Sequence, residues 1–159
     1  MGKRKKPSIT SELASTPESV SRYLAGAHTT HRLRVHLVWT PKYRRRVLQG
    51  AVAKRVEALL RQGCEVRNWP LHELNVQPDH LHLLLQIPPS VSVAKVVNLL
   101  KGRSSRLLRL EFPELEEFLW GESFWCDGYF VESVGQTQEG VIRRYIQDQG
   151  KANQDPTLF

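Results

Sequence analysis

Two histidines separated by one leucine are the residues of this chain best suited to binding a metal ion. They lie in the segment PDHLHLLLQIPP as His80 and His82. Side chains of a strand alternate between its two faces, so a strand here points both imidazoles to one face, which we expect to be exposed. Leu81 then points to the opposite, core face. Neutral imidazoles on one face can bind a single cation. The alternative is an ordinary pair of surface histidines.

A second candidate group lies in the last helical segment, GVIRRYIQDQGK. Tyr145 and Gln149 stand one helical turn apart, so we expect them on one face of a helix. The tyrosine offers a phenolic oxygen and the glutamine offers a hard amide oxygen. The alternative is a half-buried tyrosine that anchors an amphipathic helix, and the segment alone favours that alternative. The presence of the histidine pair in the same basic chain favours a functional site.

The elements that must position these residues follow from hydrophobic periodicity and turn residues. Strands are expected over 33–39, 64–76, 81–87 and 124–134, and helices over 50–63, 91–110 and 137–150. Trp39 falls on the core face of the first strand, and Thr137 is the expected N-cap of the last helix.

This order of elements predicts an α+β fold of the ferredoxin-like (RRM-like) type. It has an antiparallel sheet, helices on one face, and a C-terminal helix that carries Tyr145. Several unrelated nucleic-acid-binding modules use this fold, so it narrows the function only weakly.

The length of 159 residues fits one compact domain, which we place at 31–152. A flexible basic extension is expected over 1–30 and a short tail over 153–159. We expect no membrane span and no secretory signal, because the charged N-terminus is followed by no apolar run. Cys64 and Cys126 lack the spacing of a zinc or disulfide motif, so reduced thiols in the cytoplasm are expected.

The charge of the chain favours a polyanionic partner. The net charge is +7 and the isoelectric point is about 9.7. Two basic groups are candidate DNA phosphate contacts: Lys42, Arg44, Arg45 and Arg46 after the first strand, and Lys101, Arg103 and Arg106 on the second long helix. Solvated helix charge is the alternative, which we favour for Arg109. Tyr43, Trp120 and Trp125 could stack on unpaired bases, although core packing is the more common role of such residues.

Several segments in the same order resemble the small HUH-tyrosine transposases (transposase A, TnpA) of insertion sequences that move as single-stranded DNA, the type with one catalytic tyrosine. HUH denotes His-hydrophobic-His, matched here by His80-Leu81-His82. The similarity extends from about His31 to Gly150, over the segments HLVWTPKYRRRVL, QPDHLHLLL, LLKGRSSRLLR, LWGESFW and VIRRYIQDQ.

The resemblance implies a role for each candidate residue. Tyr145 falls on the nucleophile of the family, and His80, His82 and Gln149 fall on its metal ligands. Attack by the tyrosine leaves a 5′-phosphotyrosine and a free 3′-hydroxyl, and a second 3′-hydroxyl can displace the tyrosine without ATP or another nucleotide cofactor. The resemblance further implies single-stranded DNA with hairpin ends as substrate, and a homodimer whose subunits can share active sites.

The expected metal is Mg²⁺ or Mn²⁺. Two imidazoles and one amide add no negative charge, so a bound cation keeps its full electrophilic effect on a phosphate. Zn²⁺ prefers closed tetrahedral nitrogen and sulfur sites in structural roles.

Three other functions compete with the transposase. A non-catalytic, domesticated hairpin-DNA-binding protein of the same fold is opposed by the intact candidate residues. A related HUH nickase for replication or plasmid transfer is usually longer. A zinc hydrolase lacks a convincing third ligand and an acidic base nearby.

Overall fold

The computed structural model describes residues 23–25 and 30–151. Most of the expected extension (1–30) and the whole expected tail (153–159) lie outside these residues. The chain divides into a unit up to Arg32 and a unit from Leu33 onward. In the first unit, β1 (Leu24–Ala25) pairs antiparallel with β2 (Thr30–His31).

A four-stranded antiparallel sheet forms the centre of the second unit. Its strands are β3 (Leu33–Trp39), β4 (Leu71–Gln77), β5 (His80–Ile87) and β6 (Phe130–Ser133), in the spatial order β4-β5-β3-β6. The first and third strands of this unit, β3 and β5, therefore lie in the centre of the sheet. Each of them is followed along the chain by a helix. This arrangement confirms the expected ferredoxin-like fold.

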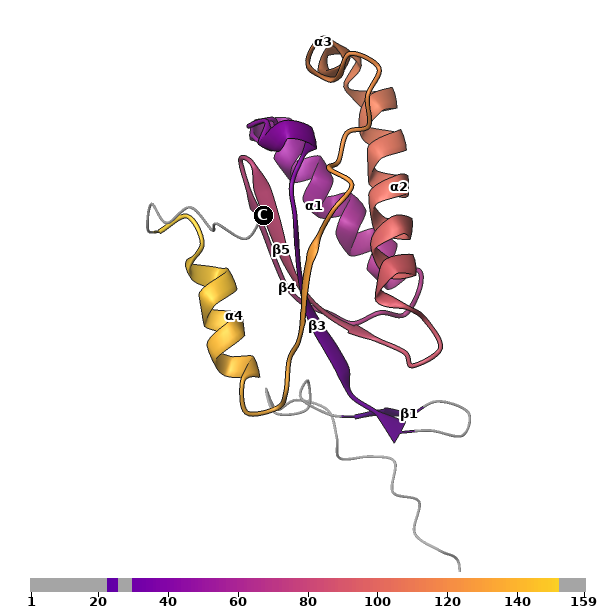
Figure 1. Ribbon diagram of the computed structural model, residues 1–159, viewed down its shortest axis with the longest axis vertical. Coiled ribbons are helices and arrows are strands. Elements are labelled where there is room, and N and C mark those ends of the chain that lie inside the picture. The colour runs from indigo at the N-terminus through magenta and orange to yellow at the C-terminus, as the bar shows by residue number, and fades with distance from the viewer. Residues whose placement is uncertain (1–22, 26–29, 152–159) are drawn as a thin grey trace, which may run out of the picture. The chain divides into compact units, whose positions relative to one another are not determined.

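One face of the sheet is covered by the two long helices, α1 (Gly50–Glu65) and α2 (Val93–Glu111) (Figure 1). The main core lies between these layers. It contains Leu81, Leu83 and Leu85 of β5, together with Val56 of α1 and Val96 of α2, all of them buried. Trp39 belongs to the same core, as the alternation of β3 predicts. Burial of these apolar side chains is the main favourable term in forming the two layers.

The opposite face of the sheet is covered by α4 (Glu139–Asp148). Figure 1 shows this helix on the side of the sheet away from α1 and α2. Ile146 and Ile142 of α4 pack on Leu84 of β5, beside Val134. The expectation that this face is exposed is therefore wrong: His80 is 7% exposed and His82 is fully buried.

Charged side chains also attach α4 to the sheet. The guanidinium of Arg34 on β3 forms an ion pair with Glu139 in the first turn of α4, and both residues are buried. Arg143 reaches Glu73 of β4 at 3.3 Å, and Gln147 donates to the same carboxylate at 2.8 Å. The helix is thus held by an apolar contact in the centre and by polar contacts to both β3 and β4.

The boundaries of several elements differ from the sequence prediction. The strand expected over 64–76 begins only at Leu71, because α1 continues to Glu65. Cys64 is buried on the same helix face as Leu60, so its burial belongs to the helical period. The strand expected over 124–134 is restricted to Phe130–Ser133, since the buried Phe124 lies in the core outside any strand.

The last helix begins later than expected. Its first residue is Glu139 and Gln138 occupies the N-cap position, so Thr137 is not the cap. The backbone amide of Glu139 instead donates to the carbonyl of Gly135. Across residues 23–25 and 30–151, no helix combines the length and apolar character needed to cross a membrane.

The buried pair of Arg34 and Glu139 generates a stability prediction. Glu139→Ala removes the carboxylate that faces a fully buried guanidinium, and loss of one partner of such a pair costs about 3–5 kcal/mol. Urea unfolding of the variant and the parent protein measures this difference. Glu117→Ala, at an exposed position of α3 (Glu116–Leu119), is the control and should change stability by no more than about 0.5 kcal/mol. Equal stability of the two variants would contradict the assigned role of the pair.

Candidate metal and tyrosine centre

Three histidines and one tyrosine meet beneath α4. His80 and His82 lie on β5, His36 lies on β3, and Tyr145 lies on α4. The ring of His82 is central: its centroid is 5.1 Å from that of His80, 5.3 Å from that of His36 and 5.7 Å from that of Tyr145. The candidate nucleophile and the candidate ligands thus come together within one chain.

The two candidate ligands are anchored in the same manner. The Nδ1 atom of His80 lies 2.7 Å from a carboxylate oxygen of Asp79, and the Nδ1 atom of His82 lies 3.0 Å from Nε2 of His36. Each Nε2 atom is buried and has no hydrogen-bond partner in the described part of the chain. An imidazole with one nitrogen anchored and the other unsatisfied is the usual arrangement of a metal-binding histidine. The residues present therefore fit a metal ion.

Burial keeps His82 neutral. Loss of solvation, together with the neighbouring His36 and His80, lowers its pKa to about 3. An interaction with Gln149 acts in the opposite direction, although no hydrogen bond of full geometry joins the two side chains. A neutral imidazole retains the lone pair that a metal ligand requires.

Gln149 reaches this site from a position just beyond the helix. It has an extended backbone (φ −60°, ψ 128°) and follows Asp148, the last residue of α4. Its carbonyl accepts a hydrogen bond from Gln77 of β4 at 3.2 Å. The next residue, Gly150, has φ +92°, and a Cβ there would lie 2.8 Å from the Gln77 side chain, so glycine permits this close approach. The glutamine is thus positioned by the end of the helix rather than by its helical face.

Asp79 connects the histidines with the basic segment. Burial raises its pKa, but the hydrogen bond to His80 and the charges of Arg44 and Arg46 outweigh that effect, so the pKa lies below its usual range. Arg44 donates to the second oxygen of Asp79 at 3.1 Å. One of the expected DNA contacts therefore also supports the aspartate that orients His80.

Two other residues of the first basic group lie against an exposed tyrosine, Tyr43. Tyr43 and Arg44 both have positive φ angles, of 59° and 50°. Arg45 lies 5.4 Å and Lys42 5.7 Å from the centre of the Tyr43 ring. A left-handed backbone at consecutive non-glycine residues is strained and is often found at functional sites.

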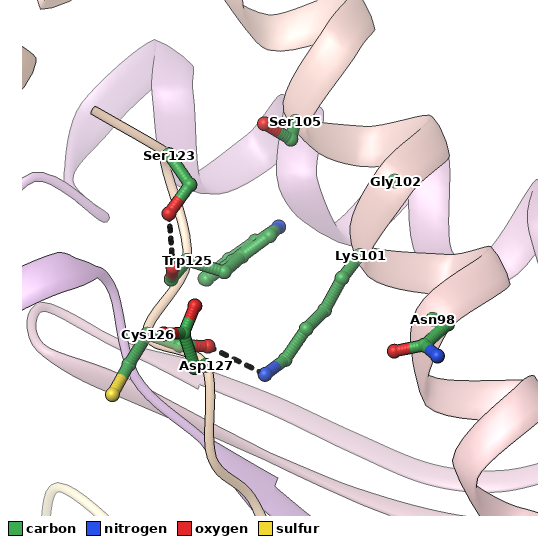
Figure 2. A pocket seen from close by; sticks show the side chains of 8 residues that line it. All are labelled: Asn98, Lys101, Gly102, Ser105, Ser123, Trp125, Cys126 and Asp127. Atoms are coloured by element: carbon green, nitrogen blue, oxygen red, sulfur yellow. Dashed lines mark hydrogen bonds between the residues drawn. The ribbon is translucent and has the colours of Figure 1, made fainter. Parts of the chain in front are cut away.

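The second basic group is divided by the fold. Lys101 is buried, and its ammonium donates to the backbone carbonyls of Cys126 and Gly128 at 2.6 Å and 2.8 Å. Figure 2 shows Lys101 extending from α2 toward Cys126, beside a pocket of about 360 Å³. Arg103 donates to the Leu59 carbonyl of α1. These contacts join α2 to its neighbours, whereas Arg106 is exposed.

The aromatic residues are divided in the same way. Trp125 is buried, and its indole nitrogen donates to Ser104 at 2.9 Å, so it belongs to the core. Trp120 is 83% exposed and has a left-handed backbone.

His36 is the residue of this centre that the sequence did not predict. Its segment, LRVHLVW, indicates only a strand. Alternation separates His36 from the core-facing Leu37, and this polar residue on the face opposite the core was the available signal. His36 lies close to His82 because β3 pairs with β5 in a register that sets Val38 opposite His82. His36 is two residues from Val38 on the same strand.

Comparison with known proteins identifies the family. The family described as "Transposase IS200 like" matches residues 29–149. The transposase of insertion sequence element IS200 from Salmonella typhimurium is 39% identical over 123 residues, covering 77% of this chain and 80% of that protein. The ISDra2 transposase TnpA of Deinococcus radiodurans is 35% identical over 124 residues, covering 78% and 89%.

Solved structures share the fold. A crystal structure of a protein from Deinococcus radiodurans R1 has a TM-score of 0.66 and 34% identity, covering 79% of this chain and 97% of that chain. The structure of a REP-associated tyrosine transposase bound to a REP hairpin has a TM-score of 0.57 at 11% identity, covering 78% and 72%. The fold and the sequence together define an HUH-tyrosine transposase. Within that class, the chain belongs to the IS200-like transposase family.

The depressed pKa of His82 predicts how stability depends on pH. Below its usual pKa of 6.5 the unfolded chain binds a proton at His82, while the folded chain stays neutral there down to about pH 3. In this window the free energy of unfolding should decrease as the pH is lowered, by up to about 1.4 kcal/mol per pH unit from this residue. Above pH 6.5 the residue should have no such effect.

Urea unfolding at a series of pH values, with chelator present, measures this dependence. His82→Phe removes the titrating group, so the variant should have a shallower slope between pH 3 and 6.5. An unchanged slope would show that the imidazole is protonated in the folded chain.

Proposed function

We propose that this transposase cleaves and rejoins single-stranded DNA at the ends of an insertion sequence, through a covalent bond between Tyr145 and a DNA 5′-phosphate. The observation that carries the proposal is the position of the Tyr145 ring beside His82, with the unsatisfied Nε2 atoms of His80 and His82. Tyr145 is 39% exposed, so a DNA strand can reach its oxygen.

The cleavage step is a transfer of a phosphoryl group. The tyrosine oxygen forms a bond to phosphorus, and the bond from phosphorus to the 3′ oxygen breaks. The departing oxygen keeps the bonding electrons and takes up a proton, and the phenol proton passes to water. Since the phosphotyrosine retains the phosphodiester, a second 3′-hydroxyl can reverse the step on a new strand without ATP or another nucleotide cofactor.

The proposed metal ligands are His80, His82 and Gln149. The described residues contain no group of three histidine, cysteine, aspartate or glutamate side chains that could hold a metal ion. The two histidines thus need further oxygen ligands, which Gln149 and the DNA phosphate can supply, and such a site suits Mg²⁺ or Mn²⁺. A bound cation of this kind would polarise the scissile phosphate and offset charge on its oxygens.

The proposed DNA contacts come from the two basic groups. Lys42, Arg45 and Arg46 are the members of the first basic group best suited to phosphate binding. Arg44, which donates to Asp79, adds its positive charge to the same group. Arg106 is the exposed member of the second group. The REP-associated tyrosine transposase with this fold binds a REP hairpin, which supports hairpin ends as the substrate here.

We further propose a homodimer in which each chain supplies a whole site. Tyr145 already lies beside His82 of its own chain, and α4 is attached by the buried Arg34–Glu139 pair. Because the tyrosine and the histidines of this chain already lie together, a site within one chain is favoured over a shared site.

Loss of the phenol oxygen tests the nucleophile. Tyr145→Phe should abolish the covalent adduct with a labelled single-stranded DNA end in Mg²⁺ while leaving hairpin binding intact, because only the attacking oxygen is removed. Denaturing gels detect the adduct, and gel shifts detect binding. Tyr129→Phe, away from the centre, is the matched control and should keep the adduct. Excess chelator should prevent the parent protein from forming the adduct.

An adduct that survives Tyr145→Phe would exclude this residue as the nucleophile. Hairpin binding by the parent protein without any adduct in Mg²⁺ would instead favour a non-catalytic, domesticated DNA-binding protein.

Mixed subunits distinguish a site within one chain from a shared site. His80→Ala and Tyr145→Phe chains should each be inactive, and a refolded mixture should stay inactive if each site is built within one chain. Cleavage gels with the mixture measure this outcome. Recovery of a substantial share of the parent activity would show that the tyrosine and the histidines come from different chains.

A further inference from the structure

His36 occupies a buried position between two polar neighbours. It is 1% exposed, and its ring is stacked on that of His82 with an angle of 15° between the planes. Its Nδ1 atom lies 2.8 Å from a carboxylate oxygen of Glu132, and its Nε2 atom lies 3.0 Å from Nδ1 of His82. The pairing of β3 with β6 sets His36 directly opposite Glu132, so the strand register fixes the first of these contacts.

The carboxylate determines the direction of both hydrogen bonds. An ionised carboxylate only accepts, so Nδ1 of His36 carries a proton and donates it to Glu132. An imidazole that carries its proton at Nδ1 accepts at Nε2, so the proton between the two rings belongs to Nδ1 of His82. The Nε2 atom of His82 is thereby left with its lone pair, and this is the buried nitrogen without a hydrogen-bond partner in the described part of the chain.

We propose that His36 and Glu132 are positioning residues that hold His82 in the tautomer whose Nε2 atom can bind the metal ion. The metal part of this inference rests on the proposed function, whereas the tautomer can be measured without it. His36 is not a ligand in this arrangement, because both of its nitrogens are already in contact with Glu132 and His82.

The second candidate ligand is oriented independently. Asp79 accepts from Nδ1 of His80, so the same reasoning leaves Nε2 of His80 with its lone pair. Asp79 lies in the turn between β4 and β5, whereas Glu132 lies on β6. Loss of the Glu132 contact should therefore change the tautomer of His82 and leave that of His80 unchanged, a selectivity that general destabilisation would not produce.

Two pairs of variants separate positioning from packing. His36→Leu removes the acceptor for His82, and His72→Leu is its control, since His72 bonds Gln86 instead of the candidate ligands. Glu132→Ala removes the terminal acceptor, while Glu132→Gln keeps an amide oxygen that can accept. The Glu132 side chain is 41% exposed, so its variants should fold even if His36→Leu does not.

The measurements use the full chain. Long-range ¹H–¹⁵N spectra of the histidine rings, recorded without metal, report the tautomers, and titration with MnCl₂ alone reports metal affinity. We expect His82 to be protonated at Nδ1 in the parent, His72→Leu and Glu132→Gln proteins. In His36→Leu and Glu132→Ala we expect a shift toward Nε2 protonation and a roughly 10–100-fold weaker affinity for Mn²⁺.

Protonation of His82 at Nε2 in the parent protein, or an unchanged tautomer in both His36→Leu and Glu132→Ala, would overturn the inference. A parent protein with the expected tautomers that binds no Mn²⁺, even with a DNA end present, would contradict the metal part of the proposed function and leave the positioning role supported.

Discussion

The docking of α4 on the sheet is the interaction on which the rest of the site depends. Leu84, Val134 and Ile146 form the apolar centre of that contact, and Arg34 and Glu139 form a buried ion pair beside it. Without the helix, this face of β5 would be open to water and Tyr145 would lie on no fixed support. The same contact therefore buries the histidines and delivers the tyrosine to them.

Burial under α4 explains why so many polar groups of the site are connected to one another. A buried polar group without a partner is unfavourable. The Nδ1 atom of His80 therefore contacts the carboxylate of Asp79, and the Nδ1 atom of His82 contacts His36, which in turn contacts a carboxylate. The exceptions are the Nε2 atoms of His80 and His82. A buried imidazole nitrogen without a partner is a position where a bound ligand can complete the structure. The electrostatics of the site thus follow from its packing.

Much of the fold followed from local patterns, while the details required contacts between distant segments. The alternation of LRVHLVW and HLHLLLQI identified two strands and their core faces correctly, because the apolar residues recur with the period of a strand. The end of α1 was misplaced because glycine often follows the end of a helix, whereas Gly63 lies inside this one. The burial of Lys101 was not visible in the sequence either, since the carbonyls that bind its ammonium lie 25 and 27 residues further along the chain.

The sequence by itself determined the ferredoxin-like order of elements and the candidate residues His80, His82 and Tyr145. These depend on residue type, on periodicity and on motifs that lie within single segments. Only the tertiary structure decided that the histidine face is buried, that Gln149 lies beyond the helix, and that His36 joins the site. The physical reason is that burial and hydrogen bonding depend on strand register and on the packing of α4, which bring together side chains far apart in the sequence.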